Sequence, residues 1–346
     1  MIYTINNCIR AFGYTNFDNL IADMGSVDNL REYVRANGYA DIAVAEDTEL
    51  LLVDTDAKTS HTGCYGAVIG PPKPYLCFTS NGDSTVRMEQ HDTPNTSANK
   101  VIQYKLNDGQ WQNWDLSAVT LHDGDKMYLK SDDEIPMCEY LAYKNFVMTG
   151  SIAASGNIMS LLNFSDTLPD YAFNSLFAYH CASLTAAPEL PATTLSAYCY
   201  YNMFSECTSL TAAPALPATT LAIECYNAMF ARCTSLAIAP ALPATTLQVD
   251  CYNNMFCYCT SLVQAPELPA TELIYGCYNY MFDGCTKLNY VKAMFTTDPT
   301  SGTYLDSWLN NVSSTGTFIK SKDATWTNEQ AGIPTGWTVQ TASPDK

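Results

Sequence analysis

Apolar and aromatic positions recur along the second half of the chain at a fixed interval of 26 residues. One repeat reads Cys-Tyr-Asn-x-Met-Phe-x-x-Cys-Thr-Ser-Leu-x-x-Ala-Pro-x-Leu-Pro-Ala-Thr-Thr-Leu-x-x-x. A single copy cannot bury its Leu, Phe and Met side chains, whereas stacked copies about 4.8 Å apart place each side chain against its equivalent. The repeating positions therefore predict a core of vertical ladders. The ladder residues are Cys181, Cys207, Cys233, Cys259, Cys285, Phe204, Phe230, Phe256 and Phe282.

Within each repeat the pattern predicts three local structures. The Ser-Leu-x-x-Ala-Pro stretch is expected to form a short strand, and Cys-Tyr-x-x-Met-Phe-x-x-Cys a helical or 3₁₀ turn. Between them, paired prolines such as Pro214 and Pro217 exclude a regular helix. After Leu288 the period fails, and tryptophans without repeat spacing indicate a C-terminal cap.

The first half of the chain shows a different pattern. Residues 1–70 are mixed, with one expected helix at 27–36 and strands at 42–44 and 50–53. The Pro-rich stretch from Gly70 to Pro74 marks a domain boundary, because consecutive prolines enforce an extended backbone. Beyond it, short alternating runs separated by turns such as Asn81-Gly82-Asp83 are typical of a small antiparallel β-sandwich.

These patterns predict five segments. They are an N-terminal docking or assembly module (1–70), a β-sandwich-like domain (71–131), a connector with N-cap (132–170), the repeats (171–290) and a C-terminal cap (291–346).

Charge and hydropathy narrow the classes of partner. The net charge is −18, with a sequence pI near 4.4 and no Lys/Arg-rich run, so a nucleic-acid backbone would be repelled. The first residues lack a basic start and an apolar run, so no secretory signal peptide is expected, and no stretch approaches the length of a membrane helix. We therefore expect neither nucleic-acid binding nor membrane insertion.

The repeat unit resembles a known repeat class. The stretch Ala228-Met229-Phe230-Ala231-Arg232-Cys233-Thr234-Ser235-Leu236 is similar to the Ala-Phe-x-x-Cys-x-x-Leu core of BspA-like leucine-rich repeats, with Met-Phe in place of Ala-Phe. The endings 315–320 and 332–339 also look like those of such proteins, so the resemblance covers about 171–346. It implies adhesion or display on the surface of gut anaerobes or in virions of their phages, without a ligand or a catalytic residue.

The expected fold class is therefore multidomain. It combines an N-terminal α+β module, a small antiparallel β-sandwich, and a leucine-rich-repeat solenoid of 26-residue repeats with a C-terminal cap.

Several residue types invite a chemical interpretation. The cysteine ladders favour buried free thiols, although stacked cysteines would be near enough for disulfides, and Cys257-x-Cys259 is the nearest approach to a zinc motif. The histidines (61, 91, 122 and 180) sit in no recognisable catalytic motif. The acidic turns at 81–83 and 123–125 resemble fragments of calcium loops but lack the EF-hand spacing. We expect no catalytic residue, no metal and no cofactor.

Binding is instead expected at positions that vary between copies, because a core column cannot vary freely whereas an exposed one can. The candidate residues are Glu206, Arg232, Tyr258, Tyr198, Glu224 and Asp250. The alternative is that these residues are exposed but have no function. The regular tyrosine column that begins at Tyr200 could stack on sugars, but its regularity favours packing.

The favoured hypothesis is a non-enzymatic structural or adhesion protein of a bacteriophage virion, as a fibre, appendage or capsid decoration, located in the virion. Its expected partners are other virion proteins or a host-surface glycan or protein, and a homotrimer is guessed from how fibres are usually built. The alternative is a bacterial cell-surface adhesin, which would be extracellular. A third hypothesis is the accessory module of a carbohydrate-active enzyme, which would require paired catalytic carboxylates.

Overall fold

The computed structural model describes residues 41–43, 51–53, 74–91, 100–139 and 143–343. The chain divides into two compact parts, Met1–Lys73 and Pro74–Lys346. In the first part, strands β1 (Asp41–Ala43) and β2 (Leu51–Val53) pair antiparallel. The helix predicted at 27–36 lies outside the described residues.

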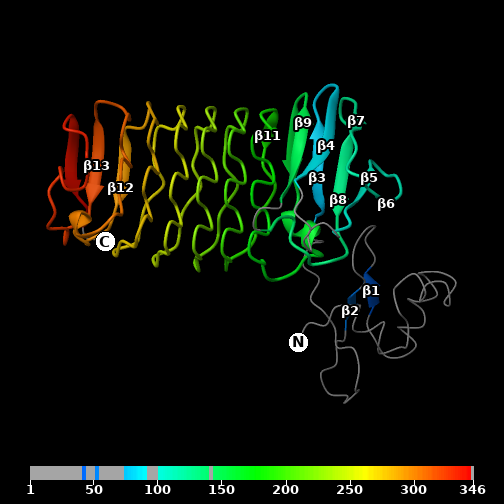
Figure 1. The fold of residues 1–346 in the computed structure, drawn as a ribbon, viewed down its shortest axis with the longest axis horizontal. Helices are drawn as coiled ribbons and strands as arrows, with labels where there is room; N and C mark the ends of the chain where they lie inside the picture. The colour runs from blue at the N-terminus through cyan, green and yellow to red at the C-terminus, as the bar shows by residue number, and fades with distance from the viewer. Residues whose placement is uncertain (1–40, 44–50, 54–73, 92–99, 140–142, 344–346) are drawn as a thin grey trace, which may run out of the picture. The chain divides into compact units, whose positions relative to one another are not determined.

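Two sheets begin the second part (Figure 1). One has the strand order β11-β10-β3-β8-β5-β6, and the other β7-β4-β9. The strands are β3 (Leu76–Ser80), β4 (Ser84–His91), β5 (Gln103–Leu106), β6 (Gln112–Asn113), β7 (Val119–Leu121), β8 (Lys126–Lys130), β9 (Tyr143–Thr149), β10 (Ile152–Ser155) and β11 (Leu184–Ala186). All pairs are antiparallel except β10 with β11, which are parallel.

Side chains from both sheets meet in one core. Phe78 on β3 contacts Phe146 on β9 edge to face, with ring centroids 4.9 Å apart. Phe146 also stacks on Phe177 of the first repeat, at 5.1 Å. The core of the sheets is therefore continuous with the core of the repeats.

A 3₁₀ helix, η2 (Ile158–Leu162), follows β10, and its first turn is capped by the side chain of Asn157, which accepts a hydrogen bond from the Met159 amide. The 26-residue repeats come next and lie side by side (Figure 1). The repeats and the start of the C-terminal end contain stretches of consecutive turns, which we call turn segments 1 to 6, at 171–179, 198–206, 224–232, 250–258, 276–284 and 306–311.

Main-chain hydrogen bonds in the turn segments alternate between two kinds of partner. Within segment 2, the amide of Met203 donates to the carbonyl of Tyr200, three residues earlier, over 3.2 Å. The next amide, that of Phe204, donates instead to the carbonyl of Met229 in segment 3, over 2.9 Å. Every second amide therefore ties a repeat to the following one.

Every fourth residue of a turn segment has a positive φ. In segment 2 these residues are Tyr198 (57°), Asn202 (53°) and Glu206 (66°). A right-handed helix cannot include a left-handed residue in each turn, so the chain forms successive turns instead.

The core consists of identical side chains in columns. Phe204, Phe230, Phe256 and Phe282 are fully buried, and their rings stack nearly parallel at 5.6 to 5.7 Å. In the cysteine column that includes Cys233, the thiol of Cys233 donates to the carbonyl of Phe204 over 3.0 Å, and equivalent contacts recur at 207, 259 and 285. Each thiol thus bonds the preceding repeat.

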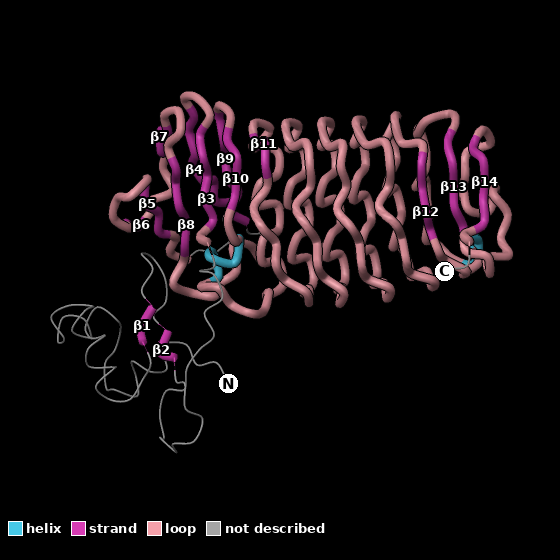
Figure 2. Tube along the Cα trace, turned by 180° about the vertical axis from the view of Figure 1, so that it is seen from behind, coloured by secondary structure: helices cyan, strands magenta, loops and turns pink. Residues whose placement is uncertain are grey.

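The C-terminal end is a parallel sheet of β12 (Tyr290–Ala293), β13 (Gly316–Lys320) and β14 (Trp337–Thr341), seen at one end of the repeats in Figure 2. A second 3₁₀ helix, η3 (Pro299–Ser301), precedes turn segment 6. Trp308 is buried, and its indole N–H donates to the carbonyl of Ala331 over 2.7 Å.

The predicted fold class is wrong. The part of the chain that the structure describes contains small sheets, turns and loops, without an α-helix, and it shows no purely antiparallel sandwich. Of the α+β module predicted for 1–70, only 41–43 and 51–53 lie within the described residues. It also lacks the leucine-rich-repeat solenoid, because no continuous sheet or helix recurs from repeat to repeat. The expected strand forms in the first repeat, as β11, and again at the end of the repeats, as β12, whereas the copies between them contribute isolated bridges such as Ala212 with Ile238.

Two local causes explain this difference. Paired prolines such as Pro214 and Pro217 have no amide to give to a strand ladder, so the expected strands do not extend. The positive φ angles convert the expected helical turn into consecutive turns.

Candidate binding surface

All six candidate binding residues occupy left-handed positions of the turn segments. Tyr198, Glu224 and Asp250 are the first such position in segments 2 to 4, with φ of 57°, 52° and 52°. Glu206, Arg232 and Tyr258 are the third, with φ of 66°, 62° and 58°. The structure therefore places them in two columns at the two ends of the turn segments.

The first-position column is partly buried and internally bonded. The Tyr198 hydroxyl donates to Glu224 Oε1 over 3.0 Å, and its ring stacks on that of Tyr171 at 4.7 Å. Partial burial and the hydrogen bond to Glu224 raise the pKa of Tyr198 to about 12. Burial also raises the pKa of Glu224, and the charge of Asp250 raises it further. This column therefore satisfies most of its own polar groups.

The third-position column is more open. The Arg232 guanidinium lies over the Tyr258 ring, 5.2 Å from its centroid, and Arg232 Nε lies 4.0 Å from Glu206 Oε1. The side chain of Arg232 is 61% exposed, and Tyr258 is 42% exposed. The Arg–Tyr pair is thus available to an external molecule.

Both columns end at glycines in segment 5. A Cβ at Gly276 would lie 1.8 Å from Asp250 Oδ1, and one at Gly284 would lie 2.5 Å from Tyr258 Cδ1. The side chains of Asp250 and Tyr258 therefore reach over the following repeat, and glycine leaves the space that they occupy.

Sequence reasoning missed two exposed tyrosines at turn segment 5. Tyr275, 58% exposed, directly precedes Gly276, and Tyr280, 41% exposed, is the middle left-handed residue of segment 5. The sequence carried a signal for them, because both positions change between copies. Tyr275 stands where the preceding repeat has Val249, and Tyr280 stands where it has Asn254. We call Glu206, Arg232, Tyr258, Tyr275 and Tyr280 the turn face.

The ladder residues lie beneath this surface. The described cysteines are free and buried, and burial raises their pKa, to about 12 for Cys233. Tyr200, Tyr226, Tyr252 and Tyr278 are each about 1% exposed and stack on one another, so this column packs inside and is inaccessible to a sugar.

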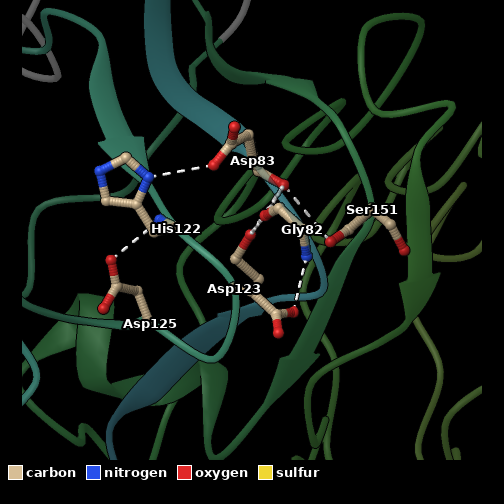
Figure 3. Close-up of polar contacts among 8 residues, drawn as sticks. Gly82, Asp83, His122, Asp123, Asp125 and Ser151 are labelled. Carbon is tan, nitrogen blue, oxygen red and sulfur yellow. Dashed lines mark hydrogen bonds and ion pairs between the residues drawn. The ribbon is translucent and has the colours of Figure 1, made fainter.

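The two acidic turns of the sheet region come together in space, as Figure 3 shows. The Gly82 amide donates to Asp123 Oδ1 over 2.9 Å, and His122 Nδ1 lies 3.0 Å from Asp83 Oδ1. Asp125 Oδ2 accepts a hydrogen bond from the His122 amide over 2.9 Å. Gly82, with φ of 96°, supplies the positive φ that the β3–β4 turn requires. The carboxylates thus bond neighbouring amides and a histidine, and no group of three or more metal-binding side chains occurs among the described residues.

The other titratable candidates are dispersed. His61 lies outside the described residues, and the side chain of His91 is not described. His122 and His180 are both exposed, on the β7–β8 turn and after turn segment 1. Asp133, in the acidic stretch 131–134, accepts a hydrogen bond from Lys100 Nζ over 2.8 Å.

Comparison of the chain with protein-family models, curated proteins and solved structures found no match. In the described residues, no helix has the length and apolar character needed to cross a membrane.

Proposed function

We propose that this chain is a non-enzymatic structural and adhesion protein of a bacteriophage virion, and that it binds a host-surface glycan or protein through the turn face. The observation that carries the proposal is the set of exposed Tyr and Arg side chains on neighbouring turn segments that are hydrogen-bonded from repeat to repeat. The virion location rests on the resemblance of the repeat unit to BspA-like repeats.

The turn face has the chemistry of a recognition surface. Tyrosine and arginine are enriched where proteins bind partners, because tyrosine offers a large amphipathic ring with few rotatable bonds. Exposed Tyr258, Tyr275 and Tyr280 offer ring faces on which a sugar or an apolar side chain can stack. Their main chain is fixed by bonds such as Tyr258 N to Asp283 O, at 2.7 Å, so little ordering is required on binding.

The location is tested by mass spectrometry of purified virions against host-cell envelopes. Recovery of the chain in virions, at a stoichiometry that follows particle number, supports the proposal. Recovery only in the envelope contradicts the virion assignment and favours the cell-surface alternative.

The binding role is tested on host cells with the triple variant Tyr258→Ala, Tyr275→Ala and Tyr280→Ala. We expect binding of the labelled chain to fall about tenfold or more, with unchanged thermal stability. The matched control is Ile238→Ala, which removes a side chain that is 66% exposed outside the turn segments. Equal binding by the triple variant and the control would exclude the turn face as the adhesion site.

A further inference from the structure

The alternating hydrogen bonds of the turn segments stop at segment 6. In segment 5, the amides of Tyr280, Phe282 and Gly284 donate to the carbonyls of Asp306, Trp308 and Asn310, at 2.7, 3.0 and 2.9 Å. The equivalent amides of segment 6 belong to Ser307, Leu309 and Asn311, and Ser307 and Asn311 have the same positive φ, 52° and 54°. Segment 6 therefore repeats the geometry of the donor row.

These three amides have no hydrogen-bond partner among the residues that the structure describes. The intervening amides of Trp308 and Asn310 are bonded within the segment, to Leu305 and Ser307, as in earlier repeats. The open amides thus form a row at every second residue, which earlier repeats use to hold the next repeat.

An open depression of about 410 Å³ lies over this row. Its lining includes Ser307, Leu309 and Asn311 together with the apolar Trp308, Val312 and Pro334. The chain after β13 contacts Trp308, whose indole N–H donates to the Ala331 carbonyl, but this chain leaves the depression unfilled. Donors and apolar surface are thus available together.

The charge of this end favours a neutral acceptor. The described residues that line the depression carry no charge, exposed Asp306 adjoins Ser307, and the whole chain has a net charge of −18. A free anion would be repelled. A strand-like peptide, by contrast, directs the carbonyls of alternate residues to one edge, which matches donors at every second residue.

We propose that the row Ser307, Leu309 and Asn311 binds the main chain of an extended, uncharged segment of a partner protein, which occupies the place of a further repeat. Main-chain hydrogen bonds hold the segment, and its side chains contact the half-buried Val312 and Pro334. The segment would bind as an added strand binds to an open sheet edge, but here it binds to a turn segment. The site is separate from the turn face and independent of the proposed function.

The test selects short linear peptides from a displayed library against the full-length chain and measures the affinity of the selected peptides. Asn311→Arg is the blocking variant, because Arg232 occupies the equivalent position and extends over the following repeat, 5.2 Å from the Tyr258 ring. Ser307→Tyr is a second blocking variant, because Tyr280 occupies the equivalent position of segment 5 with a similar positive φ. Ala237→Arg, at an exposed site in another repeat, is the matched control for added charge.

We expect affinity to fall about tenfold or more in both blocking variants and to stay unchanged in the control, since two or more main-chain hydrogen bonds are lost. Bound peptide should also slow hydrogen exchange at the amides of 307, 309 and 311, while 308 and 310 are protected already. Failure to select any peptide, equal affinity in all variants, or protection elsewhere in the chain would overturn the proposal.

Discussion

The sheets at 74–155 and the repeats at 171–288 share one core, but they are held together in different ways. In the sheets, strands pair over several residues, as β4 and β9 do from Thr85 with Thr149 to His91 with Tyr143, and the buried side chains differ from strand to strand. Neighbouring repeats bond through alternate amides of turns and stack identical side chains. A repeated sequence can therefore replace long strand ladders with columns.

The two regions also differ in what they bury. Among the described residues, the buried lysines Lys100, Lys105 and Lys144 all lie in the sheet region. The repeats bury uncharged polar groups, including Ser205, Asn227 and Asn279. Uncharged groups suit a column, because like charges stacked in successive repeats would repel one another.

The largest effect should come from opening a column. Phe230→Ala removes a fully buried ring that stacks on Phe204 at 5.6 Å and Phe256 at 5.7 Å, and we expect a loss of about 3–5 kcal/mol in the free energy of unfolding. Urea denaturation measures it. Arg232→Ala, two residues along, should change stability by less than about 0.5 kcal/mol. Similar small losses at both positions would refute the division between column and surface.

A smaller effect should come from the buried charge of the sheets. Lys100 Nζ contacts Asp133 Oδ1 at 2.8 Å and the Ile135 carbonyl at 2.6 Å, and its side chain is fully buried. Asp133→Asn leaves that ammonium without its counter-charge, at a cost of about 1–3 kcal/mol. Asp132→Asn, which breaks an exposed pair with Lys130, should be nearly silent in the same denaturation assay.

The cost of Asp133→Asn should depend on pH. Burial favours the protonated form of Asp133, but its hydrogen bond and attraction to Lys100 outweigh burial and lower the pKa of the carboxyl. Its contribution to stability is thus present above the ordinary pKa, about 3.9, and is lost as pH falls through the lower folded pKa. A difference between wild type and Asp133→Asn that grows on acidification would contradict this linkage.

The smallest effect should be at the exposed acidic turns. The hydrogen bond and charge of Asp83 raise the pKa of His122 above its ordinary value, so the pair stabilises the fold below about pH 6.5 and stops doing so as pH rises through the folded pKa. NMR titration of His122 should show this raised pKa and its return toward normal in Asp83→Asn. Asp123→Asn, whose carboxylate bonds the Gly82 amide instead, should leave it raised.

The positions of the candidate site were easier to predict than its contacts. Variation at Glu206, Arg232 and Tyr258 within a 26-residue period indicates an outward position. The period could not show that Arg232 lies over Tyr258, or that Gly276 and Gly284 make room for the side chains before them. These contacts depend on left-handed angles, which Glu, Arg and Tyr adopt here although such residues rarely do so.

The sequence by itself determined the columns, because only a period of 26 places equivalent apolar residues at equivalent positions of every repeat. The tertiary structure decided the main-chain conformation that carries them. The apolar pattern Cys-Tyr-x-x-Met-Phe-x-x-Cys suits a helical turn, but bonding to the next repeat requires every second amide to point outward, and consecutive turns with positive φ satisfy both demands. That requirement comes from the neighbouring repeat and is invisible in a single copy.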